Sequence, residues 1–277
     1  MEVLINYFET IPSLHRTLIL VGGISLFWIL EGVFPIVRFN YKKWKHSIPN
    51  FFFTFTTILV NLIFAFFIVT ISDFTQEIEG GIYYWLGGIS IVIKLIVGLV
   101  IMDFISAWFV HWLQHKTPLL WRLHVVHHTD EHVDTTTALR HHPGESILRA
   151  TFTCLAVFFV GAPIWLVMIY QSLSAIFSQF NHSNFKLPIW LDKGLSYVIV
   201  TPGMHRVHHH HEQPFTDSNY GNIFSIWDRV SGNFAVMKYE DVKFGLDVYK
   251  DEPQSLKDLL ISPKILYTKN KKKNRKL

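Results

Sequence analysis

The chain has 277 residues, of which 50% are hydrophobic and 16% aromatic, and its formal net charge is +4 at pH 7. This composition is too apolar for an ordinary soluble domain, so we expect an integral membrane protein. Much of the positive charge lies in the tail 269–277, which has no aromatic residue. The tail therefore favours contact with anionic lipid over nucleic-acid binding. The single cysteine, Cys154, excludes an internal disulfide and a thiolate-rich metal site.

Three segments have the length of about 20 apolar residues that a bilayer requires, namely Leu18–Val37, Phe51–Ile71 and Ile82–Met102. No basic region or small-residue cleavage pattern surrounds the first, so we expect it to be a membrane helix and not a cleaved signal peptide. The loop 38–45 is basic and the loop 73–79 is acidic. The positive-inside rule then places the first loop, and the chain after about Asp103, on the cytoplasmic face.

A fourth apolar block, Ile147–Phe177, holds 31 residues and is interrupted by Gly161, Ala162 and Pro163. Glycine and proline favour a break, so we expect a hairpin of two arms that returns to the side from which it came. No repeat or linker divides the chain. We therefore predict one all-α, multi-span membrane domain over 1–268, with a cytosolic histidine-rich core for two metals over 103–234 and a basic tail over 269–277.

The histidines are concentrated in one part of the sequence, because 14 of the 16 lie between His111 and His211. Three motifs contain eight of them: HWLQH at 111–115, HVVHH at 124–128 and HRVHH at 205–209. Residues three and four apart share one face of a helix, so each motif is expected to direct its imidazoles at one point. The spacing therefore predicts that each motif supplies part of a metal site.

The number of imidazoles indicates how many metals are bound. A structural zinc takes four ligands and a catalytic zinc commonly takes three, so eight imidazoles favour two metal ions. Imidazole binds iron, zinc, copper and nickel, and the ligand type does not select among them. His182, which follows the hairpin, is well placed to complete the site, whereas three isolated histidines and two at the end of the last run are expected to lie outside it: His15, His46, His132, His210 and His211.

The ordered series HWLQH, HVVHH and HRVHH, on a chain with membrane hairpins, resembles the fatty acid hydroxylase/sterol desaturase superfamily of integral-membrane, non-haem di-iron enzymes. The resemblance extends from Asp103 to about Phe234. It also includes the stretch 137–145 after the second motif, the stretch 181–184 around the isolated histidine, and the closing stretches 219–222 and 225–229.

The resemblance implies two iron ions that activate dioxygen and attack a C–H bond of a lipid, with zinc as a possible substitute in purified protein. The implied ligands are His111, His115, His124, His127, His128, His182, His205, His208 and His209. Some relatives carry a further histidine where this chain has Ser178, so the second metal has one candidate fewer. Five further residues are possible ligands or could orient the ligand imidazoles: His142, Asp103, Asp134, Glu145 and Asp228. For the four acids, a plain helix cap or a solvated charge is the alternative role.

The partners follow from the same chemistry. No dinucleotide fingerprint, haem motif or cysteine cluster occurs, so a separate cytochrome, ferredoxin or reductase is expected to supply two electrons per turnover. The lipid, whether sterol, fatty acyl, ether lipid or a similar molecule, can enter laterally from the bilayer. Hydroxylation and desaturation both stay open, as do the bacterial inner membrane and the endoplasmic reticulum.

Two other classes of protein compete with the oxygenase. A zinc-dependent membrane hydrolase needs a carboxylate for proton transfer, and no His-Glu-x-x-His sequence occurs, which leaves Glu145 and Glu212 as substitutes. A metal transporter is expected to carry ligands inside its spanning segments, whereas these histidines follow the third span. The sequence therefore favours the oxygenase, then the hydrolase, then the transporter.

Overall fold

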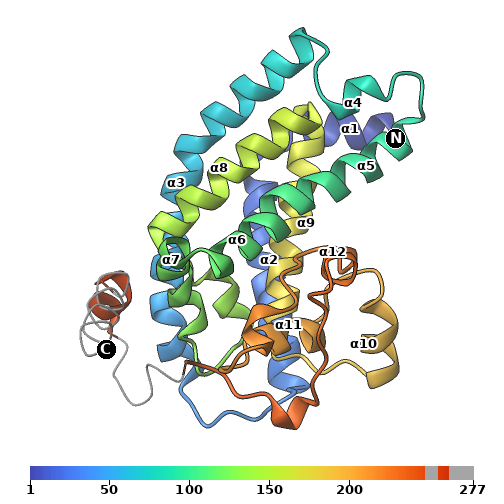
Figure 1. Ribbon diagram of the computed structural model, residues 1–277. Coiled ribbons are helices and arrows are strands. Elements are labelled where there is room, and N and C mark those ends of the chain that lie inside the picture. Colours follow the sequence, from blue (N-terminus) through green and yellow to red (C-terminus); the bar gives the residue numbers. More distant parts are fainter. Residues whose placement is uncertain (247–254, 262–277) are drawn as a thin grey trace, which may run out of the picture.

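The computed structural model describes residues 1–246 and 255–261 (Figure 1), and this part of the chain is built from helices and loops, with two isolated β-bridges and no longer strand. The predicted all-helical class is confirmed. The α-helices are α1 (Glu2–Glu9), α2 (Ser13–Val33), α3 (Lys43–Glu77), α4 (Ile82–Trp85), α5 (Ile91–Asp103), α6 (Val110–Lys116), α7 (Pro118–His128), α8 (Pro143–Val160), α9 (Ile164–His182), α10 (Ile189–Leu195), α11 (Pro202–His208) and α12 (Ile226–Val230).

Four segments of the described chain are long and apolar enough to cross a membrane: Ser13–Val33, Lys43–Trp85, Ile91–Lys116 and Pro143–Val160. The second predicted span, Phe51–Ile71, lies within α3, whereas the first, Leu18–Val37, extends four residues beyond the end of α2 at Val33. The third prediction was wrong in its boundaries, because Ile82–Met102 is not one helix. Gly87 has a φ of 47° and follows the short α4, and α5 begins only at Ile91. Glycine adopts this left-handed conformation without the clash that a Cβ would cause.

The third span continues beyond its predicted end. After α5 the chain forms a π-helix, Phe104–Phe109, and then enters α6 without a break. A π-helix adds a residue to the turn and changes which side chains share a face. This change of register precedes His111, the first histidine of the first motif.

The fourth apolar block forms the predicted hairpin. Gly161 adopts a φ of 67° at the end of α8, and Pro163 precedes α9, so neither helix continues through the turn. The two arms have 18 and 19 residues and extend beyond the predicted block at both ends. The ring of His127 lies 5.2 Å from that of His141 and 4.8 Å from that of His182. Both outer ends of the hairpin therefore lie at one end of the bundle.

The apolar core lies where α5, α8 and α9 pack together, and Met102, Val157 and Leu166 are fully buried there. Along α3, in contrast, large apolar side chains such as Leu62 and Phe66 are 67% and 71% exposed. This outward apolar surface is what a helix presents to lipid. Figure 1 shows α7 and α11 at the opposite end of the bundle from the turn between α8 and α9.

The loop between α2 and α3 and the first turn of α3 lie at the same end as the histidine motifs. His46 contacts Asp130 at 2.7 Å and Asp134 at 3.2 Å, and these acids follow the second motif. The ring of His132 stacks on Tyr41. The isolated histidines of this region therefore hold loops together, as expected of residues outside the metal site. The predicted basic tail, 269–277, lies outside the described residues.

Candidate metal centre

Two groups of histidines stand next to each other at this end of the bundle. In each group the nitrogen atoms that face one another lie within 4.8 Å. One group has five histidines and the other has four, and together they contain all nine candidates from the sequence. The groups are His111, His115, His124, His128 and His208, and His127, His182, His205 and His209.

The second and third motifs divide their histidines between the two groups, so the expectation that each motif aims at a single point was wrong for these two, whereas both histidines of HWLQH join the first group. His124 and His128, four residues apart, join the first group, and His127 joins the second. His205 and His209 likewise share the second group. Four residues advance a helix by about 400° and three by about 300°, so the i, i+4 pair is better aligned than the i, i+3 pair. The residue at i+3 therefore points to the neighbouring group.

The hydrogen bonds of the rings establish which nitrogens face inward. The Nδ1 of His111 donates to the carbonyl oxygen of Tyr220 at 2.8 Å, and the Nδ1 of His124 donates to Glu145 at 2.8 Å. Because a neutral imidazole carries one proton, both Nε2 atoms then have a lone pair and no hydrogen. These two Nε2 atoms face each other at 3.0 Å. Two lone pairs at this distance repel unless a cation lies between or beside them.

The second group has the same arrangement. The Nδ1 of His182 donates to the carbonyl oxygen of Ser178 at 2.7 Å, so its Nε2 is a free acceptor. That atom lies 3.0 Å from the Nε2 of His127 and 3.0 Å from the Nε2 of His205. Imidazole nitrogens bind divalent metals at about 2.0 to 2.1 Å. Two nitrogens on one ion therefore lie roughly 3 Å apart, which matches the distances of 3.0 Å between these Nε2 atoms.

Several inward nitrogens have no partner at all within the described chain. The Nε2 atoms of His115 and His208 are buried without a hydrogen bond, as are both ring nitrogens of His209. Burial and, next, neighbouring imidazoles lower the pKa of His208 and His209 well below 6.5. Both rings are therefore neutral, which is the form that binds metals. Unpaired buried nitrogens are costly, and a bound cation in each group would satisfy them.

The four acids proposed from the sequence differ in what they contact. Glu145 is fully buried and contacts His124 directly. Asp103 and Asp228 contact none of the nine histidines; their carboxylates accept backbone N–H groups of the loop 220–224. Since Tyr220 accepts the hydrogen of His111, these two acids fix the loop that orients a histidine. Asp134 lies elsewhere, at the start of the 3₁₀-helix Thr135–Leu139.

The structure places His141, and not the predicted His142, beside the histidine groups. The Nδ1 of His142 accepts the N–H of Gly144 at the start of α8, and its Nε2 contacts the carbonyl of Leu260, so it belongs to neither histidine group. His141 instead lies beside His127 and 3.9 Å from Glu145. Adjacent histidines in a loop give no periodic signal, so the sequence could not distinguish the two.

Sequence reasoning missed other groups that hold the rings. Asp217 contacts the Nδ1 of His115 at 3.2 Å, and the carbonyl of Ser218 accepts the Nδ1 hydrogen of His208 at 2.7 Å. Backbone carbonyls carry no sequence signal, and Asp217 lies 102 residues from His115. A third set, His210, His211 and Glu212, lies apart from the two groups and is partly exposed. The expectation that His210 and His211 stand outside the site agrees with this arrangement.

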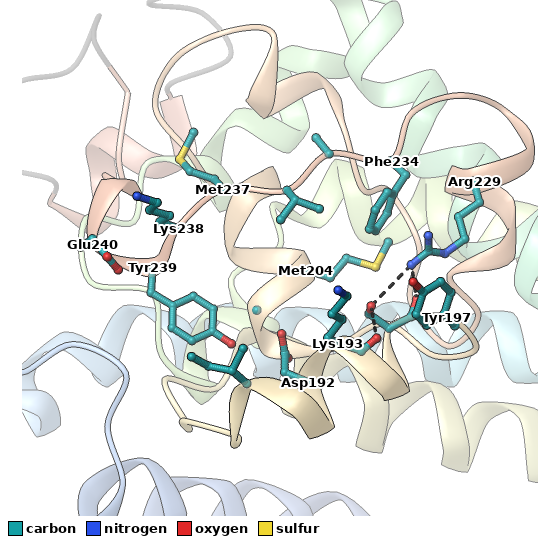
Figure 2. Close-up of a pocket in the computed structure, with 15 residues that line it drawn as sticks. Asp192, Lys193, Tyr197, Met204, Arg229, Phe234, Met237, Lys238, Tyr239 and Glu240 are labelled. Atoms are coloured by element: carbon teal, nitrogen blue, oxygen red, sulfur yellow. Dashed lines mark hydrogen bonds between the residues drawn. The ribbon is translucent and has the colours of Figure 1, made fainter.

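Two cavities lie near the centre. One, of about 180 Å³, is bordered by His141 and Ser178, next to the group of four histidines. The other, of about 470 Å³, lies between α10, α11 and the segment 234–240, and none of the nine histidines lines it. Figure 2 shows Arg229 in this larger cavity, hydrogen-bonded to Ser196 beside the ring of Tyr197. The larger cavity therefore faces the outer side of the helix that carries the third motif.

The fold and the site define a helical membrane bundle with two adjoining, buried imidazole groups at one end. Residues 95–233, half of the chain, match the model of the fatty acid hydroxylase family, and the chain belongs to that family. No solved structure shows a significant match.

Among known proteins, the chain is 32% identical over 131 residues to alkylglycerol monooxygenase of Caenorhabditis elegans, which covers 47% of this chain and 25% of that protein. It is 31% identical over 152 residues to alkylglycerol monooxygenase of Homo sapiens, covering 52% and 31%. It is 25% identical over 152 residues to ornithine lipid hydroxylase OlsE of Rhizobium tropici, covering 55% and 45%. The chain thus spans less than half the length of each of these relatives.

Proposed function

We propose that this protein is a membrane-bound oxygenase that uses dioxygen and two electrons to hydroxylate a C–H bond of a lipid. The overall reaction is R–H + O₂ + 2 e⁻ + 2 H⁺ → R–OH + H₂O, so one oxygen atom enters the lipid and the other leaves as water. The observation that supports this best is the pair of buried imidazole groups, whose inward nitrogens carry lone pairs or lack partners. The named relatives are a monooxygenase and a hydroxylase of lipids.

The nine histidines would hold two iron ions, five rings for one and four for the other. Bound iron supplies the one-electron and dioxygen chemistry that no amino-acid side chain provides. The protein's own groups fix the rings: Glu145 and Asp217 accept hydrogens from His124 and His115. Such contacts raise the basicity of an imidazole and hold its tautomer.

The burial of the rings has a second role. Eight of the nine residues are at most 6% exposed, and the side chain of His115 is covered as well. Bulk water is therefore excluded from the inner face of the site, which protects a reactive oxidant from side reactions. The lipid would reach the site from the bilayer, and a separate protein or reductase would deliver the electrons.

The hydrolase is less well supported than the oxygenase. Of the two glutamates that could serve it, Glu145 is engaged with His124, and Glu212 lies in the separate, partly exposed set. Neither is a free carboxylate beside both groups. A transporter would need ligands along a path through the bundle, whereas both groups lie together at one end.

The test uses full-length protein purified in detergent after expression with iron. We expect about two irons per chain, and dioxygen uptake with a chemical reductant that rises when a membrane-lipid extract is added, with a hydroxylated lipid found by mass spectrometry. Zinc can displace iron during expression, so a zinc-loaded sample is first reconstituted with iron without oxygen. Reconstituted protein that oxidises no lipid, but cleaves one, would refute the oxygenase and favour the hydrolase.

A further inference from the structure

The smaller cavity lies inside the membrane bundle, between α2, α3 and α9, and has a volume of about 180 Å³. Pockets that enclose a whole small ligand usually measure about 300 to 1,000 Å³. This cavity can therefore take one segment of a lipid, while the remainder stays in the bilayer.

The inner end of the cavity touches the metal centre. Ser178 lines it, and the carbonyl of the same residue holds His182 through a 2.7 Å hydrogen bond. His141 also lines the cavity, and its ring centroid is 5.2 Å from that of His127. A lipid segment in the cavity would therefore lie directly beside the group of four histidines.

A row of polar side chains runs along α3 toward the same place. Asn50, Thr54, Thr57 and Asn61 are spaced by four, three and four residues and so share one face of the helix. The row is about 16 Å long at 1.5 Å per residue, roughly half the hydrocarbon thickness of a bilayer. The last three of these residues line the cavity.

The partners of these side chains differ along the row. Asn50 donates to Thr136, and the hydroxyl of Thr54 donates to the carbonyl of Asn50. The hydroxyl of Thr57 pairs with Ser146 at 2.7 Å. Asn61 makes no hydrogen bond to the described part of the chain and is exposed in the middle of a membrane-spanning helix. Hydrocarbon offers an amide no partner, so an unpaired asparagine at this position is costly without a ligand.

We propose that this cavity binds the part of the lipid that carries the oxidised C–H bond, and that this part contains a hydrogen-bonding group such as an ether oxygen, a hydroxyl or an amide. The proposal rests on the proposed function. Asn61 and Thr57 would position the polar group, and the small volume of the cavity keeps that group within a few bonds of the reacting carbon. A plain hydrocarbon chain would leave Asn61 unpaired and is expected to bind worse.

The test measures binding in the absence of reductant, with full-length protein in phospholipid vesicles. One probe is 1-O-hexadecylglycerol with a photoreactive diazirine on its alkyl chain, and the other is a hydrocarbon of equal length with the diazirine at the same place. We expect the ether probe to label peptides covering 54–61 or 175–179, and the hydrocarbon to label them several-fold less. Equal labelling by both probes, or labelling elsewhere, would overturn the proposal.

Variants of α3 then test the row itself. Asn61→Leu removes the amide and is expected to lower labelling by the ether probe about tenfold, which corresponds to one lost hydrogen bond, while Asn61→Gln retains most of it. Thr70→Val is the matched control, since Thr70 lies on the same helix outside the cavity and bonds the carbonyl of Phe66. Unchanged labelling in Asn61→Leu would refute the assignment.

The binding test and the turnover test can fail separately. Labelling of the cavity without oxidation of any lipid would contradict only the proposed function. Oxidation of lipid together with labelling away from α3 and α9 would contradict only the cavity assignment.

Discussion

The contact between Glu145 and His124 gives the sharpest test of how the rings are held. Glu145 is fully buried, and its carboxylate accepts the Nδ1 hydrogen of His124 at 2.8 Å. Removing such a partner typically weakens metal binding by 10- to 100-fold, which equals about 1.4 to 2.7 kcal/mol. Glu145→Gln keeps the shape of the side chain but loses its charge. We therefore expect this substitution to weaken metal binding by the group of five histidines by about this amount.

The assay is a chelator titration of iron-loaded protein, followed by metal analysis. Wild-type protein is expected to lose its ions at high chelator concentration. Glu145→Gln should lose about one ion at a 10- to 100-fold lower chelator concentration. It should keep the other ion, because His124 belongs to only one group. Asp134→Asn is a matched control, since Asp134 is also buried but contacts Tyr41 and His46. Simultaneous loss of both ions in Glu145→Gln, or no loss, would refute the reasoning.

Four further outcomes are expected. Replacing His208 by alanine should abolish lipid oxidation and lower the bound metal to about one ion per chain, by elemental analysis. Replacing His46 by alanine should preserve both, but lower the melting temperature, because it removes the imidazole that contacts buried Asp130 and Asp134, and breaking such a buried pair costs about 3 to 5 kcal/mol. Chelation of both metals should also lower the melting temperature, and added iron should restore it. Gly161→Ala should cost at least about 1 to 2 kcal/mol in thermal unfolding, since its φ is 67° and a Cβ would clash with the carbonyl oxygen of Gly80; an unchanged transition would contradict this.

The predictions for the individual helices succeeded where the sequence pattern is local. The hairpin was predictable because Gly161 and Pro163 interrupt an apolar block that is too long for one span. The third span was harder, because the break at Gly87 and the π-helix Phe104–Phe109 lie within a nearly uniform apolar run. Apolar composition predicts a membrane segment. It does not predict the pattern of backbone hydrogen bonds, which decides where a helix starts or changes from α to π.

The sequence by itself determined that the eight histidines of the three motifs are candidates for two metals, because the spacing within each motif is a property of the helix that carries it. The family resemblance added the isolated His182. Only the tertiary structure decided which ring joins which group, since His124 and His127 belong to one motif and yet to different groups. It also decided that Asp217 holds His115 and that His141, and not His142, faces the cavity. These contacts join residues that are distant in sequence or lie in irregular loops, so no periodicity records them.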